Sequence, residues 1–511
     1  MGRSRPIFYN ALMLTGVNLL LRLVSTSFQV FISGRIGASG VGLLQLVLSV
    51  ASLSMTAGVA GVRTATMYLT AEELGKKRRE NVTWILSGCV RYSLLISTAI
   101  GLGVYGFAPL IATVWIGNSC TVGAVRLFAA FLPVSCLSGV MIGYFTAANR
   151  IGMLAAVEVA EQLVSMGVIT ASLLLWAGKD TGRCCQSVVL GSCVGSCVTL
   201  SSLVVLRLLE RPEMGKRIPV ANRLMAVAVP LAVADDLKMG ITTTENLMVP
   251  KRLALYTGAG DALAQFGTVC GMVFPVLMFP AAILHGLSDL LIPEMARCNS
   301  AGSEKRIRYL TRRSLRLALF YGIACGGILF LAADPLCKQL YRSEEAGEYL
   351  RWFALLAPML YCDAVIDAMN KGLGQQTFCV RINILTSIMD VVGLYFLLPV
   401  WGMKGYFVSF VISHGVNAAL SLGLLLKITK LRISPHVPWL AVGSMAGAIM
   451  AADLLTHPAA KTAVFLLMAV SSLYLTGVLY GEDVRWLISL SGLQKKRKFS
   501  RFFSKIPFDK S

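Results

Sequence analysis

Three arginines lie within long apolar runs near the start of the chain: Arg22, Arg63 and Arg91. An arginine near the middle of a bilayer costs roughly 2.5–3.5 kcal/mol on insertion scales, so a span seldom carries one without a use for it. A planar guanidinium binds phosphate oxygens in pairs, whereas a lysine offers only a point charge. The three arginines therefore predict a cavity that holds an anion. In the competing interpretation, Arg63 and Arg91 reach toward the headgroups or pair with Glu158 and Glu161.

A second polar run lies in a later apolar stretch, around residues 235–246. Four of its members are ionisable, and four such groups within one span cannot all face lipid. One interpretation is a coupling-ion site, in which carboxylate, amide and hydroxyl oxygens hold Na⁺ or exchange H⁺. The other is neutralisation of Lys238 by Asp235, with the remaining groups along a wet cavity wall. The residues assigned to ion coupling or cavity lining are Asp235, Asp236, Lys238, Glu245 and Asn246.

Outside these two sets, the sequence shows no pattern typical of catalysis or of a metal site. The 4 histidines are isolated from one another, and neither a phosphate-binding glycine loop nor a metal-ligand spacing is present. We therefore expect no enzyme activity, no catalytic residue, and no cofactor or metal apart from a coupling ion. Three carboxylates in later spans, Asp363, Asp367 and Asp390, are expected to form salt bridges between the two halves of the chain.

Membrane-spanning helices must position these residues. The chain has 511 residues, of which 56% are hydrophobic and 14% charged, and its mean hydropathy is +0.70. Apolar stretches recur along it, each near the length of about 20 residues that crosses a hydrocarbon core of about 30 Å. The sequence predicts an all-α polytopic membrane protein with about fourteen transmembrane helices.

The charge distribution predicts which side of the membrane each loop faces. The net charge is +21, and basic clusters recur on alternate loops, as at Lys76–Arg79, at Arg207–Arg223 and in the tail at Lys495–Lys498. This asymmetry follows the positive-inside rule and places both termini in the cytoplasm of a bacterial cell. Because the charge carries topology and attracts anionic membrane lipids, nucleic acid is not an expected partner.

The basic connection at Arg207–Arg223 divides the chain into comparable halves. A Gly-rich turn at Gly34–Gly42 has a weak echo after the seventh span, where the turn is expected to begin at Pro250. Six spans per half predict a parallel repeat about an axis along the membrane normal. The predicted parts are an N-lobe (1–210), a C-lobe (211–430), two accessory spans (431–485) and a basic cytoplasmic tail (486–511).

Four segments carry a resemblance to a known superfamily. They are Phe31–Gly42, Gly58–Thr66, Val249–Leu253 and Phe279–Glu294. In these segments the chain resembles the multidrug/oligosaccharidyl-lipid/polysaccharide (MOP) flippase superfamily, and within it the stage V sporulation protein B-like polysaccharide-transport branch, which is related to lipid II flippases. The likeness extends over all the predicted spans.

The resemblance implies two six-helix lobes that rock about a central cavity, and a substrate of the undecaprenyl-diphosphate-linked saccharide class. It also implies cavity arginines on the first two spans, a role that Arg22 and Arg63 match by location. The eighth span departs from the pattern, because it carries His285 and Asp289 where a cavity arginine is expected.

Three functions remain in competition at this point. The leading one is an alternating-access flippase for a lipid-linked peptidoglycan or polysaccharide precursor, including one used in the spore cortex. The alternative is a multidrug exporter of the same superfamily coupled to Na⁺ or H⁺, although a pocket that extrudes cations should not gather arginines. The third is a membrane scaffold that recruits envelope-synthesis proteins. In each case we expect a monomer.

Overall fold

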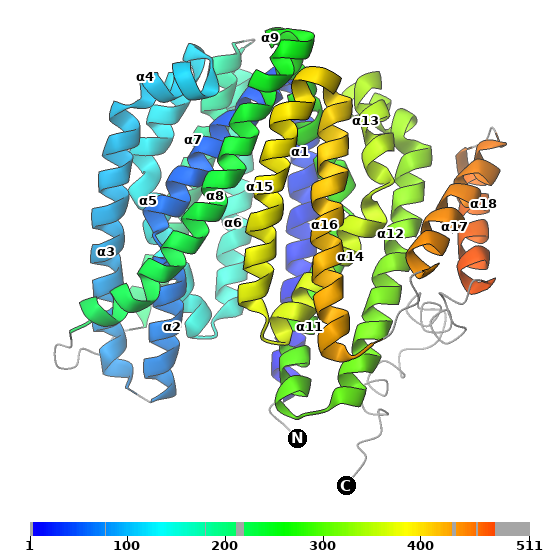
Figure 1. Cartoon of the computed structure of the whole chain (residues 1–511). Coiled ribbons are helices and arrows are strands. Elements are labelled where there is room, and N and C mark those ends of the chain that lie inside the picture. Colours follow the sequence, from blue (N-terminus) through cyan, green and yellow to red (C-terminus); the bar gives the residue numbers. More distant parts are fainter. Residues whose placement is uncertain are drawn as a thin grey trace. The chain divides into compact units, whose positions relative to one another are not determined.

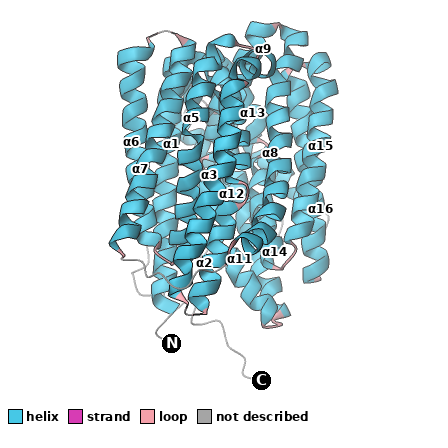
Figure 2. Ribbon diagram, turned by 90° about the vertical axis from the view of Figure 1, so that its left-hand side faces the viewer, coloured by secondary structure: helices cyan, strands magenta, loops and turns pink. Residues whose placement is uncertain are grey.

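The computed structural model describes residues 4–76, 78–178, 180–210, 219–431, 436–455 and 458–475. In this part of the chain every regular element is a helix (Figures 1 and 2). Nine of these helices are long and apolar enough to cross a membrane, or ten if the bent pair Glu344–Ala354 and Ala357–Gly372 forms one span. The segment Leu23–Gly75 has 53 residues, which is more than the length of about 20 residues that one span needs. The predicted all-α polytopic fold is confirmed.

The chain forms two compact units, which we describe separately. The first comprises Met1–Gly286, Asp334–Leu350 and Thr377–Asn417, and the second comprises the remaining segments. These units group segments by contact rather than by repeat, so the predicted lobe boundaries stay a prediction. The predicted tail at 486–511 lies outside the described residues.

The first unit is built mainly from long helices joined by short turns. In chain order its elements are α1 (Ser4–Val59), α2 (Val62–Gly75), α3 (Arg79–Gly106), α4 (Ala108–Leu110), the π-helical η1 (Ile111–Ile116), the short η2 (Ser119–Thr121), α5 (Val122–Ala147), α6 (Ile151–Ser172), η3 (Leu173–Ala177), α7 (Thr181–Leu209), α8 (Ala221–Thr257), α9 (Ala259–Gly267), η4 (Thr268–Val273), α10 (Phe274–Met278) and α15 (Gln376–Trp401). The first part of α16 (Met403–Thr429) also belongs to it.

The two Gly-rich segments singled out in the sequence lie against each other in this unit. Within α1 the backbone leaves the helical conformation at Gly37 (φ 76°, ψ 170°), a region that glycine enters without a steric penalty. A Cβ added at Gly42 would lie 2.3 Å from the carbonyl oxygen of Leu263, and one at Gly267 would lie 2.1 Å from that of Ala38. Glycine at both positions therefore allows α1 and α9 to pack backbone against backbone.

The turn predicted at Pro250 is wrong. α8 continues through Pro250 to Thr257, and the chain turns at Gly258 (φ 89°). A proline removes one backbone donor from a helix, but helices in membranes tolerate it when neighbouring groups satisfy the freed carbonyl. The consequence is that Lys251 and Arg252 are helical residues rather than loop residues.

The second unit contains the later helices. Their bounds are α11 (Ala281–Ser300), α12 (Glu304–Tyr341), α13 (Glu344–Ala354), α14 (Ala357–Gly372), α17 (His436–Asp453) and α18 (Pro458–Leu475), with parts of α11, α12 and α13 in the first unit. Its core includes Ile323, Met445, Ala448 and the fully buried Phe465. The Phe465 ring fills the space that a side chain at Gly327 would need, 1.8 Å from the Cβ position.

Candidate functional site

The structure places the three predicted arginines on α1, α2 and α3. Arg22 lies in α1, and its side chain is outside the part of the chain that the structure describes. Arg63 is the second residue of α2 and is exposed within the unit. Its guanidinium lies near enough to Glu158 of α6 for an electrostatic interaction, but the described residues form no ion pair with it within 4.0 Å. Arg63 and Glu158 therefore interact electrostatically without forming a direct ion pair.

Arg91 is held by its own helix. Its Nε donates a hydrogen bond to the Ser87 carbonyl oxygen (3.3 Å), and a terminal nitrogen donates to the Ser87 hydroxyl (3.0 Å). The side chain is exposed, and no described carboxylate pairs with it. No contact among the described residues joins it to Arg63. Both cations are therefore available to an anion. The two interpretations both stay open: the arginines bind an anion in a cavity, or they extend toward the lipid headgroups.

The middle of α8 is bonded to the second part of α1. Asn246 Nδ2 donates to the hydroxyl of Ser49 (2.9 Å), and Thr243 Oγ1 donates to the Ser49 carbonyl oxygen (3.2 Å). The Asn246 amide nitrogen thus bonds α8 to α1, and the role of Asn246 in ion coupling or cavity lining stays a prediction. The side chain at this position therefore fixes how α8 lies against α1.

The charged residues earlier in α8 do not neutralise one another. Lys238 forms no ion pair with Asp235 or Asp236 in the described part of the chain, so the predicted Lys238–Asp235 pair is absent there. Asp236 Oδ1 is buried without a protein hydrogen-bond partner. The residue Asp236 lines a cavity of about 390 Å³ between α8 and α15, together with residues that include Thr244 and Ile388.

Further along α8, one carboxylate lies within electrostatic range of a carboxylate on another helix. Glu245 lies near enough to Asp390 of α15 for a direct electrostatic interaction. Asp390 is 7% exposed and accepts a hydrogen bond of 2.6 Å from the hydroxyl of Ser409 on α16. The expectation that Asp390 forms a salt bridge between the halves is wrong, because its partner in the described residues is a hydroxyl of the same unit. Asp367 also departs from that expectation, since it pairs with Lys371 one turn along α14 (2.6 Å).

Aromatic and sulfur side chains enclose this acid pair. Tyr406 is 5% exposed, lies near both carboxylates, and is hydrogen-bonded to the Cys270 thiol. The ring of His414 interacts with Asp390 and packs on Phe410 with centroids 4.0 Å apart. Sequence reasoning missed these neighbours, because only the fold brings η4, α15 and α16 to α8. Isolated acidic residues in apolar spans were the one available signal.

The oxygen atoms at the acid pair are suitable ligands for a hard cation, and its carboxylates can also bind a proton. In the described residues, no group of three or more His, Cys, Asp or Glu side chains comes together as a transition-metal site requires. Carboxylate and hydroxyl oxygens suit Na⁺, and paired acids within a span are typical of proton relays. The pair of Glu245 and Asp390 is therefore the best candidate for ion coupling, and of its two members only Glu245 was assigned that role from the sequence.

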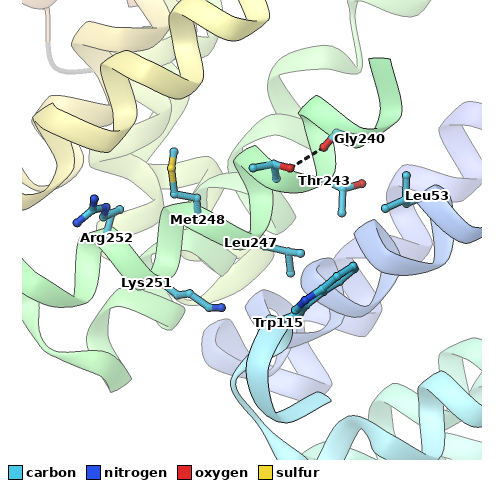
Figure 3. A pocket seen from close by; sticks show the side chains of 9 residues that line it. Leu53, Trp115, Gly240, Thr243, Leu247, Met248, Lys251 and Arg252 are labelled. Carbon is cyan, nitrogen blue, oxygen red and sulfur yellow. Dashed lines mark hydrogen bonds between the residues drawn. The ribbon is translucent and has the colours of Figure 1, made fainter. Parts of the chain in front are cut away.

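A second cavity, of about 430 Å³, lies beside the later part of α8 (Figure 3). Its lining combines apolar and cationic side chains: Leu53, Trp115, Gly240, Thr243, Thr244, Leu247, Met248, Lys251 and Arg252. Lys251 Nζ donates to the carbonyl oxygen of Val114 (2.6 Å). The guanidinium of Arg252 stacks on the ring of Tyr395, 3.2 Å from its centroid. Sequence reasoning missed this cavity, because it treated both cations as loop residues.

Comparison with known proteins gives the family. A family model described as "Lipid II flippase MurJ" matches residues 66–480. Stage V sporulation protein B of Bacillus subtilis (strain 168) is 23% identical over 409 residues, which are 77% of this chain and 78% of that protein. A solved structure of lipid II flippase MurJ in an inward closed conformation has a TM-score of 0.66 at 12% identity, covering 91% of this chain and 98% of that one. An inward-facing MATE multidrug transporter of the MOP superfamily has a TM-score of 0.65 at 14% identity, covering 81% and 98%.

The two solved structures are too distant in sequence to show more than the fold. The family match is of another kind, since it extends over most of the chain and over both predicted lobes. The resemblance to MOP flippases inferred from the sequence is confirmed. The chain belongs to the family described as lipid II flippase MurJ, and it is a multi-pass membrane transporter rather than an enzyme.

Proposed function

We propose that this transporter moves a saccharide linked to a polyprenyl diphosphate across the cytoplasmic membrane, toward peptidoglycan or another envelope polysaccharide. The family match over residues 66–480 carries this proposal, because the family's own description names lipid II as what is flipped. The similarity to a sporulation protein supports an envelope role and extends the proposal to spore-wall precursors.

Arg63 and Arg91 are the proposed binding groups for the diphosphate linker of the substrate. Both guanidinium groups lack a carboxylate ion pair in the described residues, and Arg91 contacts only Ser87 through hydrogen bonds. A diphosphate offers several oxygens in the geometry that a guanidinium bonds in pairs. With Arg22 of α1 as the third member, the proposed anion site spans three helices of the first unit.

Glu245 and Asp390 are the proposed coupling site. Two carboxylates on neighbouring helices repel each other when both are ionised, and a bound Na⁺ or a proton relieves that repulsion. Because the pair joins α8 to α15, binding and release of the cation would change how these helices interact. Alternation of the predicted lobes 1–210 and 211–430, with both termini in the cytoplasm, would convert that change into transport.

A reconstituted-liposome assay tests the proposal. The assay follows how fast a polyprenyl-diphosphate saccharide in the inner leaflet becomes accessible from outside. We expect Arg63→Ala to lower the rate at least tenfold, because a charge-assisted hydrogen bond contributes about 1.5–3 kcal/mol. Arg126→Ala is the matched control, since Arg126 stacks over Tyr105 (5.5 Å) outside the proposed site. Equal rates for wild type and Arg63→Ala would remove the arginines from the mechanism.

One observation favours a second function, a multidrug exporter coupled to Na⁺ or H⁺. The acid pair at Glu245 and Asp390 suits an organic cation as well as a coupling ion, and the fold is shared with MATE transporters. The same liposomes decide between the two functions when they are loaded with a fluorescent organic cation. Gradient-driven export of the dye without movement of the lipid-linked saccharide would establish the exporter.

A further inference from the structure

We infer that the cavity beside Lys251 and Arg252 is a binding site for the phosphate group of a lipid. Its lining includes neither the proposed arginines of α1 to α3 nor the carboxylates of the acid pair. It lies between the later part of α8, the second part of α1 and the η1 turn that carries Trp115 (Figure 3). All the residues that form it belong to the first unit.

The size and lining of the cavity fit an amphiphile. Its volume of about 430 Å³ falls within the range of about 300–1,000 Å³ that is typical of small-molecule sites. Leu53, Leu247 and Met248 supply an apolar surface, and Trp115 adds a ring of the kind that lies at membrane interfaces. Figure 3 shows Lys251 extending from α8 toward Trp115. The apolar wall and the ammonium therefore meet within one hollow.

The charge of the lining selects an anion. Lys251 and Arg252 are cationic, and no carboxylate is among the residues that line the cavity. Neither cation forms an ion pair with a carboxylate in the described residues. Lys251 donates to the backbone carbonyl of Val114, and Arg252 stacks on the ring of Tyr395. These neutral partners position the two groups and leave both positive charges uncompensated beside an apolar wall.

Cations near the end of a helix in a membrane protein attract the phosphates of anionic lipids. On the cytoplasmic side, basic pockets between transmembrane helices bind the headgroups of anionic lipids, and the same attraction between a cation and a phosphate holds on the other side. Lys251 has three N–H donors, one of which the Val114 carbonyl occupies. The remaining two N–H groups can donate hydrogen bonds to phosphate oxygens while a hydrocarbon chain follows Leu53 and Leu247. A neutral or zwitterionic lipid would gain less, because its headgroup carries no net charge to offset the cations.

Two lipid sources share this chemistry, namely an anionic phospholipid of the bilayer and the polyprenyl diphosphate of the proposed substrate. Binding to the full-length purified transporter in detergent separates them. The probes are phosphatidylglycerol and farnesyl diphosphate, with phosphatidylcholine as the zwitterionic reference, and native mass spectrometry counts the bound molecules. Saturable binding of either anionic probe, in preference to phosphatidylcholine, is the expected result.

The decisive variant is the double substitution Lys251→Gln/Arg252→Gln. Each Lys or Arg near an anionic lipid surface contributes about 1 kcal/mol, so removing both should weaken binding about 30-fold. The control is Arg126→Gln/Arg183→Gln, which also removes two cations stacked on aromatic rings, here Tyr105 and Trp176. If charge in general attracts the probe, both variants lose affinity equally and the inference fails.

A second variant keeps the test valid if Lys251→Gln/Arg252→Gln does not fold. Leu247→Trp fills the cavity and leaves both cations in place, so it should also abolish saturable binding. Unchanged binding in Leu247→Trp, or equal occupancy by phosphatidylcholine, would overturn the site. Since no transport is measured, failure of the flippase proposal would leave these results interpretable.

Discussion

The cations at the two ends of α8 have different kinds of interaction partner. Near its start, Arg223 donates hydrogen bonds of 2.9 Å to both Glu72 and Glu73 at the end of α2. Near its other end, Lys251 bonds to a backbone carbonyl and Arg252 stacks on a tyrosine ring. Charge is therefore compensated by carboxylates at the first end and left uncompensated at the second.

α8 is also more closely packed against its neighbours at the first end than at the second. At the first end, a Cβ added at Gly61 would lie 2.4 Å from the Ala228 carbonyl oxygen, so α8 touches the turn between α1 and α2 without space to spare. At the second end, the cavity of about 430 Å³ separates α8 from Trp115. Paired charges with close packing are typical of a structural contact, and unpaired charges beside a hollow are typical of a binding site. The comparison assigns a different role to each end.

The largest effect should come from Gly61→Ala, which breaks the close contact. Gly61 has φ +69°, where an alanine is strained, and the added methyl meets backbone atoms that cannot move aside. We expect a loss of stability of about 2–4 kcal/mol, from overpacking and backbone strain together. Heating in the presence of a thiol-reactive dye measures it, because unfolding exposes buried cysteines such as Cys89 and Cys136.

Gly103→Ala is the control for that experiment. Gly103 lies within α3, and an added Cβ has no atom within 4 Å. Alanine is favoured over glycine inside a helix by about 1 kcal/mol, so this variant should be as stable as wild type or slightly more stable. A smaller loss for Gly61→Ala than for Gly103→Ala would contradict the close contact at the first end of α8.

The next effect should come from Arg223→Gln. Glu73 has a side chain only 2% exposed, and it is bonded to both Arg223 and Asn81. Removing the arginine leaves a buried carboxylate without its cation, which should cost about 1–3 kcal/mol of stability. Thermal unfolding measures the loss, and the double variant Glu73→Gln/Arg223→Gln should recover part of it. If the double variant were less stable than wild type by the sum of the losses in Glu73→Gln and Arg223→Gln, the two side chains would not interact.

Sequence reasoning could predict the fold class because long apolar runs are a local property, which each segment shows alone. It could also single out Arg63, Arg91 and Glu245, since a charged residue in an apolar run stands out without a structure. It could not pair Glu245 with Asp390, because the contact depends on the fold that brings α8 to α15.

The same limit explains the errors near the end of α8. Pro250 is a local signal for a turn, and Lys251 and Arg252 were placed in a loop for that reason. The helix nevertheless continues through Pro250 to Thr257. Only then do the two cations fall beside Leu53 and Trp115, which belong to distant parts of the chain. The candidate lipid site was therefore beyond reach of the sequence alone.

The smallest effect on stability should come from Lys251→Gln, at the open end of α8. The substitution removes one hydrogen bond to the Val114 carbonyl from an exposed side chain. The glutamine amide can still donate, so unfolding should change by less than about 1 kcal/mol, well below the loss in Arg223→Gln. The same thermal assay compares the two variants directly. If Lys251→Gln destabilised the transporter as much as Arg223→Gln, both ends of α8 would be structural contacts. The uncompensated charge at the second end would then be no argument for a binding site.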